Sequence, residues 1–246
     1  MNIKFFIPLL VVLITAMSCT FTEEIHLKND GSGTYAFKMD MGTMMASLKD
    51  MNTKDSLKEA KVLDTIIFFK DILEENRDSI SKLDAEEKAM IEALEDLKLH
   101  MQVDEEKGIM LMDFGMDFHN IADLKNMEEK IAKAQALSDK KKEDSGMPSK
   151  TNIVYSFDGN TFKRSVSLKD LPKEKIQEID ASMKESSSFF DESIYRLVYH
   201  FEKDIKEVTF KNAVISENKR TMTIEVPMDS VVKNPMWLDF EVKLKK

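Results

Sequence analysis

Residues 97–118 read LKLHMQVDEEKGIMLMDFGMDF, and their alternation indicates the kind of fold that the chain adopts. Apolar and polar side chains alternate on both sides of a polar turn at residues 104–108. Side chains two residues apart share one face of a strand, so the stretch predicts a β-hairpin with a half-buried face. The returning strand, residues 109–118, is apolar on both faces for half its length, which predicts a central position in the sheet.

Hairpins of the same kind recur along the chain. Alternating strands flank polar turns at Asp30-Gly-Ser-Gly33, at Asp158-Gly159-Asn160 and at residues 216–219, and each hairpin precedes a helix start. Two further alternating strands cover residues 195–201 and 238–244. The predicted class is α+β: a mainly antiparallel sheet built from repeated β-hairpin–helix units, with helices packed on it.

Helices are predicted where apolar residues follow a spacing of three and four. One is expected over residues 56–75, and another from Asp84, with Glu87 as its capping-box partner. Asn120 is expected to cap a helix that carries Leu124 and Met127. The remaining expected helices open near Thr43, at Pro172 and near Asp229.

The domain organisation follows from these elements. Residues 1–18 form a signal segment, residues 19–138 a first hairpin-helix half, and residues 150–246 a second one. The polar residues 139–149 between them are the predicted linker. We expect one compact domain overall, and the repeated pattern fits a duplication and convergence equally well.

The first 18 residues have the pattern of a cleaved export signal. Lys4 is followed by an apolar run over residues 5–14 and by small residues before Cys19, the only cysteine. A membrane-spanning helix needs about 20 apolar residues, so this run is too short to be one. The alternatives are a membrane-anchored precursor cut elsewhere and a buried free cysteine.

Residues 15–19 resemble the lipobox of bacterial envelope lipoproteins. With the hairpin around Asp30-Gly-Ser-Gly33, residues 15–41 are also loosely similar to LppM-like lipoprotein domains. The resemblance implies lipidation of Cys19, cleavage before it, no disulfide in the mature chain, and a domain for which lipid binding is expected. Thr20 in place of Asp implies the outer membrane, on either its periplasmic or its surface face.

Composition limits the class of protein. The net charge is −9, with 33% charged and 42% hydrophobic residues, which is typical of a globular body. The acidic balance excludes nucleic acid as a partner, because phosphate binding needs clustered Lys and Arg. Neither a Gly-rich phosphate loop nor a Gly-x-Ser-x-Gly elbow occurs, so we expect no cofactor and no enzymatic activity.

Polar residues on the predicted strands supply two candidate sites. Asp113, Asp117 and His119 alternate with apolar residues and form a candidate polar site, against the simpler interpretation of a polar strand end with helix capping. We expect no metal site. His26, His100 and His200 lie on polar strand faces, where ordinary solvent-facing histidines are favoured over a set of metal ligands.

Methionines cluster on two of the predicted strands. Met39, Met41, Met110 and Met112 fit core filling, or a groove for an acyl chain or peptide. The expected function is that of a non-enzymatic, membrane-anchored envelope lipoprotein that binds lipid, another hydrophobic ligand or a partner protein. The alternatives are a structural or assembly component of an outer-membrane complex and, less favoured, a hydrolase using Asp113 and Asp117.

Overall fold

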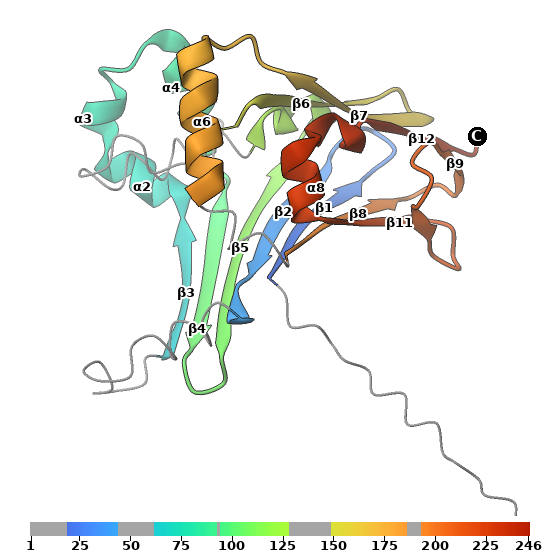
Figure 1. The fold of residues 1–246 in the computed structure, drawn as a ribbon, viewed down its shortest axis with the longest axis horizontal. Helices are drawn as coiled ribbons and strands as arrows, with labels where there is room; N and C mark the ends of the chain where they lie inside the picture. The colour runs from blue at the N-terminus through green and yellow to red at the C-terminus, as the bar shows by residue number, and fades with distance from the viewer. Residues whose placement is uncertain (1–18, 44–61, 93, 128–148, 186–192) are drawn as a thin grey trace, which may run out of the picture.

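An eight-stranded sheet, named sheet A here, forms the largest layer of the protein (Figure 1). The structure is a computed structural model, and it describes residues 19–43, 62–92, 94–127, 149–185 and 193–246. In spatial order the strands of sheet A are β10 (Val214–Ile215), β11 (Thr221–Pro227), β8 (Ile194–Phe201), β1 (Thr20–Leu27), β2 (Gly33–Asp40), β5 (Ile109–Phe118), β4 (Lys98–Asp104) and β3 (Val62–Phe68).

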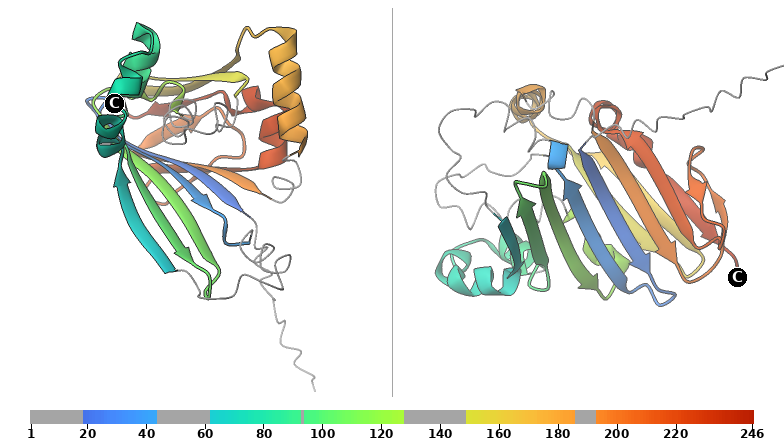
Figure 2. Two further views of the ribbon diagram at one scale, coloured as in Figure 1. Left: turned by 90° about the vertical axis from the view of Figure 1, so that its left-hand side faces the viewer. Right: turned by 90° about the horizontal axis from the view of Figure 1, so that it is seen from below.

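A second sheet, sheet B, lies over one face of sheet A (Figure 2). The face of sheet A toward sheet B is called the inner face, and the opposite face is called the outer face. The four strands of sheet B are, in spatial order, β6 (Thr151–Phe157), β7 (Thr161–Leu168), β12 (Phe240–Leu244) and β9 (Ile205–Val208).

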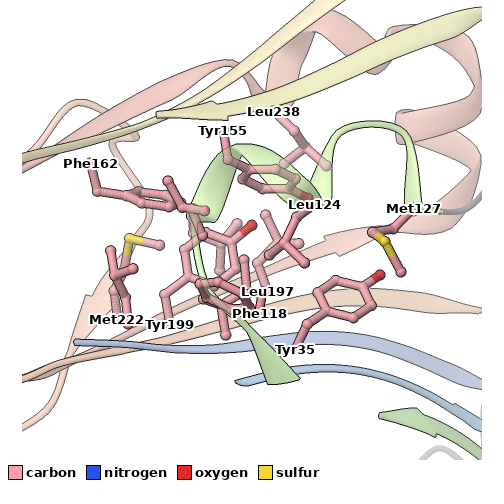
Figure 3. Packing of buried hydrophobic residues seen from close by; sticks show 14 of the residues in the cluster. Tyr35, Phe118, Leu124, Met127, Tyr155, Phe162, Leu197, Tyr199, Met222 and Leu238 are labelled. Atoms are coloured by element: carbon pink, nitrogen blue, oxygen red, sulfur yellow. The ribbon is translucent and has the colours of Figure 1, made fainter. Parts of the chain in front are cut away.

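The core lies between the two sheets. Figure 3 shows Tyr155 and Phe162 of sheet B facing Tyr199 and Leu197 of sheet A. The rings of Phe162 and Tyr199 lie 5.2 Å apart between centroids, in an edge-to-face arrangement. Alternation along each strand places these apolar side chains on one side, so two half-buried sheets cover each other.

Sheet A is mixed, because one of its strand pairs is parallel. β1 pairs antiparallel with β2 but parallel with β8, and the other pairs of the sheet are antiparallel. β8 and β11 come from the second predicted half of the chain and lie in the same sheet as β1 and β5. β5 lies between β2 and β4, so its predicted central position is confirmed.

The predicted α+β class, with helices packed on a mainly antiparallel sheet of hairpin-helix units, is wrong. The described residues are mostly β, with 12 strands among them, and sheet B lies over the inner face where helices were expected. None of the helices in the described ranges has the length and apolar character needed to cross a membrane. The described α-helices are short: α2 (Phe69–Glu75), α3 (Arg77–Ile80), α4 (Ala85–Glu92), α6 (Lys173–Glu185) and α8 (Met228–Lys233).

The helix predicted over residues 56–75 is mainly wrong. Residues 62–68 form β3, paired with β4 along its length, and only residues 69–75 are helical. The β-branched residues Val62, Ile66 and Ile67 favour a pleated strand, which overrode the apparent helical spacing. Residues 56–61 lie outside the described residues.

Four other predicted helix starts are found in the structure. Asp84 Oδ1 accepts a hydrogen bond from the Glu87 backbone N–H at 2.8 Å, directly before α4. Asn120 caps the 3₁₀ helix η1 (Ile121–Leu124), but Asn126 turns the chain with a positive φ of 52°. The helix starts predicted at Pro172 and near Asp229 are confirmed as α6 and α8. Most of the predicted helix after Thr43 and of the linker lies outside the described residues.

Candidate functional site

A hollow in the outer face of sheet A, named the outer pocket here, is the candidate site. Its volume is about 440 Å³. Ala36 of β2 lies opposite Gly115 of β5 in the strand register, so no long side chain fills the middle of this face. Around these small residues the wall carries polar side chains from four strands: Glu24, His26, Lys38, His100, Asp113 and Asp117.

The parallel pairing of β1 and β8 brings two histidines together at one edge of the outer pocket. His26 lies opposite His200 in the register, and partner residues in a parallel pair point to the same side. Their rings stack with centroids 3.9 Å apart and an angle of 8° between the planes. Glu24 precedes His26 by two residues, so it shares the outer face with both histidines.

One carboxylate oxygen serves both histidines. Glu24 Oε1 lies 3.2 Å from His26 Nε2 and 3.0 Å from His200 Nε2. The other oxygen, Oε2, accepts a hydrogen bond from Lys38 Nζ at 2.6 Å. His200 Nδ1 contacts Thr221 Oγ1 at 3.0 Å, so both ring nitrogens of His200 have a partner. The cluster is therefore held by contacts from β1, β2, β8 and β11.

The electrostatics of this cluster follow from burial and charge. Partial burial acts to raise the pKa of Glu24, but the hydrogen bonds from Lys38 and His200 outweigh it and leave this pKa below its ordinary value. Burial and the neighbouring His26 lower the pKa of His200. Glu24 is therefore an anion at neutral pH, and His200 is predominantly a neutral imidazole that can accept a proton or a metal ion.

The predicted polar site is only partly assembled. Asp113 and Asp117 both line the outer pocket, but His119 follows the end of β5 and is not part of the wall. Burial raises the pKa of Asp113, and within the described residues its Oδ1 has no hydrogen-bond partner. His100 pairs with Asp64 at 2.7 Å and lies on β4, with β2 and β5 between it and His26 on β1. The set His26, His100 and His200 is therefore not brought together.

The four methionines of the predicted groove lie at one end of the inner face. Met39 and Met112 are cross-strand partners and pack, half-buried, against the core. Met41 is buried, and its backbone N–H donates to the Met110 carbonyl at 2.9 Å. Cys19 lies at the same end, directly before β1, with Sγ 3.2 Å from Thr43 Oγ1. These contacts fit the core-filling interpretation, and the groove stays a prediction.

A buried ion pair on the inner face escaped the sequence prediction. Glu23 and Arg164 are each 1% exposed, and Glu23 Oε2 lies 3.4 Å from Arg164 Nη2. Three tyrosine hydroxyls donate to the same carboxylate: Tyr155 at 2.7 Å, Tyr195 at 3.0 Å, and Tyr199. The sequence did contain a sign of this pair, since both charged residues occupy positions that alternate in phase with apolar neighbours.

Comparisons with known proteins do not assign the chain to a family. No family model matches the sequence, and no curated protein matches it. The NMR structure of the folded domain of LppM from Mycobacterium tuberculosis is similar, with a TM-score of 0.37 and 7% identity. The alignment covers 92% of this chain and 89% of that chain. A likeness this weak carries no conclusion about function.

Proposed function

We propose that the chain is the precursor of a membrane-anchored bacterial envelope lipoprotein that binds a lipid or another hydrophobic ligand and has no catalytic role. The position of Cys19 carries the proposal. Its backbone carbonyl accepts a hydrogen bond from Ile194 N at 2.9 Å, and β1 begins at the next residue. An acyl group on Cys19 would therefore be joined directly to the sheet, without a flexible tether.

The surroundings of Cys19 support a hydrophobic ligand. Cys19 is buried on the inner face, beside Thr43 and at the same end as Met41 and Met110. Lipidation of Sγ replaces the contact with Thr43, so the acyl chains leave the fold at this end. Two or three chains hold a protein on a bilayer far more firmly than one. The end of the inner face that carries the methionines then lies against the membrane, most simply the outer membrane.

Replacing the anchor residue tests the first half of the proposal. The Cys19→Ala chain is expected to leave the membrane fraction, to keep its larger precursor size and to lose labelling by a fatty-acid analogue. Thr43→Ala is the matched control, because it removes the partner of Sγ and keeps the cysteine. Unchanged size and membrane association of Cys19→Ala would contradict the anchor.

Native mass spectrometry of the mature chain with Cys19→Ser tests the second half. We expect a co-purified lipid or fatty acid, which is lost when both Met41 and Met110 are changed to Glu. Leu168→Glu is the control, because this exposed apolar residue ends β7 in sheet B. A ligand-free mass for the unsubstituted chain would contradict ligand binding and leave the anchor proposal intact.

An assembly role in an outer-membrane complex is the second candidate, favoured by the edge strand β3. Val62, Ile66 and Phe68 of this strand are exposed, and an edge strand offers unpaired backbone groups to another chain. A photo-crosslinking residue at Ile66 is then expected to capture one defined envelope protein in cells. The same residue at Leu168, an exposed position on β7, which lies between β6 and β12 and is not an edge strand, is the control. Equal labelling at both positions would count against this role.

A further inference from the structure

The structure assigns a second binding site to this chain: we propose that Glu24, His26 and His200 bind a divalent transition-metal ion such as Zn²⁺. Each residue offers one ligand atom, and these atoms all lie within 4.8 Å of one another. The two nitrogens and one carboxylate oxygen form the donor set that zinc commonly takes in proteins. This inference does not depend on the membrane anchor or on the inner-face methionines.

Two of the three spacings between the ligand atoms fit a tetrahedral ion, and the third, between the two imidazole nitrogens, lies within 4.8 Å. Zinc–nitrogen and zinc–oxygen bonds of about 2.0–2.1 Å place two ligand atoms of a tetrahedron roughly 3.3 Å apart. Glu24 Oε1 already lies 3.2 Å from His26 Nε2 and 3.0 Å from His200 Nε2. The carboxylate oxygen therefore needs to move by only a few tenths of an ångström relative to each imidazole to admit the ion.

One ring has to turn for the ion to enter. The two imidazoles are nearly parallel, with an angle of 8°, whereas a shared metal ion has to lie close to the plane of each ring. His26 is the ring free to rotate, since its side chain is 55% exposed and its contacts within the described residues are Glu24 and His200. The backbone of the sheet stays fixed, which gives the site a rigid base.

Two of the three ligand side chains, His200 and Glu24, also have hydrogen-bond partners of the kind that surround metal ligands in proteins. Thr221 Oγ1 lies 3.0 Å from His200 Nδ1 and accepts a hydrogen bond from it when the ring is in its Nδ1–H tautomer, which leaves Nε2 without a proton and free for the ion. Lys38 holds Glu24 Oε2 at 2.6 Å, so that Oε1 stays directed at the histidines. Such outer partners fix the tautomer and the orientation of metal ligands.

The types of ligand atom limit which ions the site can bind, and their number shows that one ligand position of the ion stays open. Imidazole nitrogens with one carboxylate favour Zn²⁺, Cu²⁺ or Ni²⁺ over Mg²⁺ and Ca²⁺, which prefer oxygen ligands. Three protein ligands also leave a fourth position of a tetrahedral ion open, as in zinc sites that accept water or a small ligand. Because Glu24 and His26 line the outer pocket, that position is reached from the pocket.

The test is titration of the purified, chelator-treated chain with ZnCl₂, followed by competition with a chromophoric chelator. We expect one saturable ion per chain, and loss of that binding in His26→Ala, in His200→Ala and in the near-isosteric Glu24→Gln. Thr221→Val is expected to weaken binding by about 10–100-fold, as typical for an outer partner of a metal ligand. Circular dichroism checks that each variant is folded.

Matched controls distinguish this site from other residues of the chain that could bind a metal ion. His119→Ala and His100→Ala are expected to keep full affinity, because His119 lies outside the pocket and His100 pairs with Asp64. Cys19→Ser is also expected to bind normally, which shows that the lone thiol is not a ligand. The proposal is overturned if the unsubstituted chain binds no saturable ion. It is equally overturned if Cys19→Ser abolishes binding or the His26→Ala, His200→Ala double variant retains it.

Discussion

Two neighbouring glutamates on β1 meet opposite environments, because successive side chains of a strand point to opposite faces. Glu23 faces the inner side and is 1% exposed, whereas the Glu24 side chain faces the outer pocket and is 19% exposed. Glu23 is enclosed by Arg164 and tyrosine hydroxyls, and Glu24 by two histidines and Lys38. Glu23 thus joins the two sheets on the inner face, whereas Glu24 belongs to a partly exposed cluster of polar side chains on the outer face.

The inner glutamate connects elements that are far apart in the sequence. Its carboxylate on β1 contacts Tyr155 of β6, Arg164 of β7 and Tyr199 of β8, so it joins sheet A to sheet B. Arg164 also donates to the carbonyl of Leu238 at 3.1 Å, and Leu238 is the last residue of the 3₁₀ helix η2 (Pro235–Leu238). Burial acts to lower the pKa of Arg164, but the charge of Glu23 outweighs it and raises this pKa above its ordinary value, so Arg164 keeps its positive charge.

Removing the charge of Glu23 is expected to have the largest effect on stability. Glu23→Gln leaves Arg164 buried without a counter-charge, and breaking a buried pair in this way costs about 3–5 kcal/mol. Glu24→Gln is the matched control on the same strand, and its ion pair with the half-exposed Lys38 is expected to contribute about 1 kcal/mol or less. Urea unfolding followed by circular dichroism gives both values. Equal losses for the two variants would remove the distinction between the faces.

The expected loss of stability arises because one buried charge is left without its partner, and not because the two positions require charged residues. Replacing both partners, as in Glu23→Leu with Arg164→Met, is therefore expected to destabilise the protein less than the sum of the two single changes, because no buried charge remains. A double variant that loses the full sum would show that the two residues act independently.

Removing a tyrosine hydroxyl on the inner face is expected to cause the next largest loss of stability. Burial and the charge of Glu23 raise the pKa of Tyr199 well above its ordinary value, so its hydroxyl keeps the proton that it donates. Tyr199→Phe removes this hydrogen bond to a charged group, at a cost of about 1.5–3 kcal/mol. The same change in the Glu23→Gln background is expected to cost less, and strictly additive unfolding free energies would contradict the coupling.

The sequence predicted which side chains share a face far better than it predicted which strands are neighbours. Alternation placed Glu23 with Phe21 and Ile25, and Tyr195 with Tyr199, on common faces, and the structure confirms these assignments. Local alternation carries no information on pairing between distant strands. The parallel pairing of β1 with β8 is what joins His26 to His200, so the histidine cluster could not be predicted.

The wrong fold class has a similar origin. The hairpins were predicted correctly, but the partner that covers their apolar faces is a second sheet, formed by strands such as β7 and β12. In the sequence, an alternating strand shows that it has a face to bury and does not show whether a helix or a sheet covers it. The short apolar stretch of β3 was ambiguous as well, because a strand and a helix segment of that length give the same apolar content.

The smallest expected effect concerns a second pair of carboxylates, both on the outer face. Hydrogen bonds lower the pKa of Glu24, whereas burial raises that of Asp113 above its ordinary value of 3.8. The charges that face Asp113 are Lys38 on β2 and His100 on β4, which favour its ionised form, and Glu24 on β1, which opposes it. Folding therefore acts against ionised Asp113, and favours its protonated form.

The upward shift in the pKa of Asp113 predicts how the effect of Asp113→Asn on stability depends on pH. Since the folded protein binds the Asp113 proton more tightly than the unfolded chain, the residue destabilises the protein increasingly as the pH rises through the folded-state pKa. Asp113→Asn is then expected to raise the thermal midpoint at pH 7, and the gain is expected to shrink as the pH falls toward 3.8. Asp117→Asn, an exposed change on the same strand, is the control and should show no such gain. A gain at Asp113 that is independent of pH would mean that the amide acts through a new hydrogen bond and not by removing a buried charge.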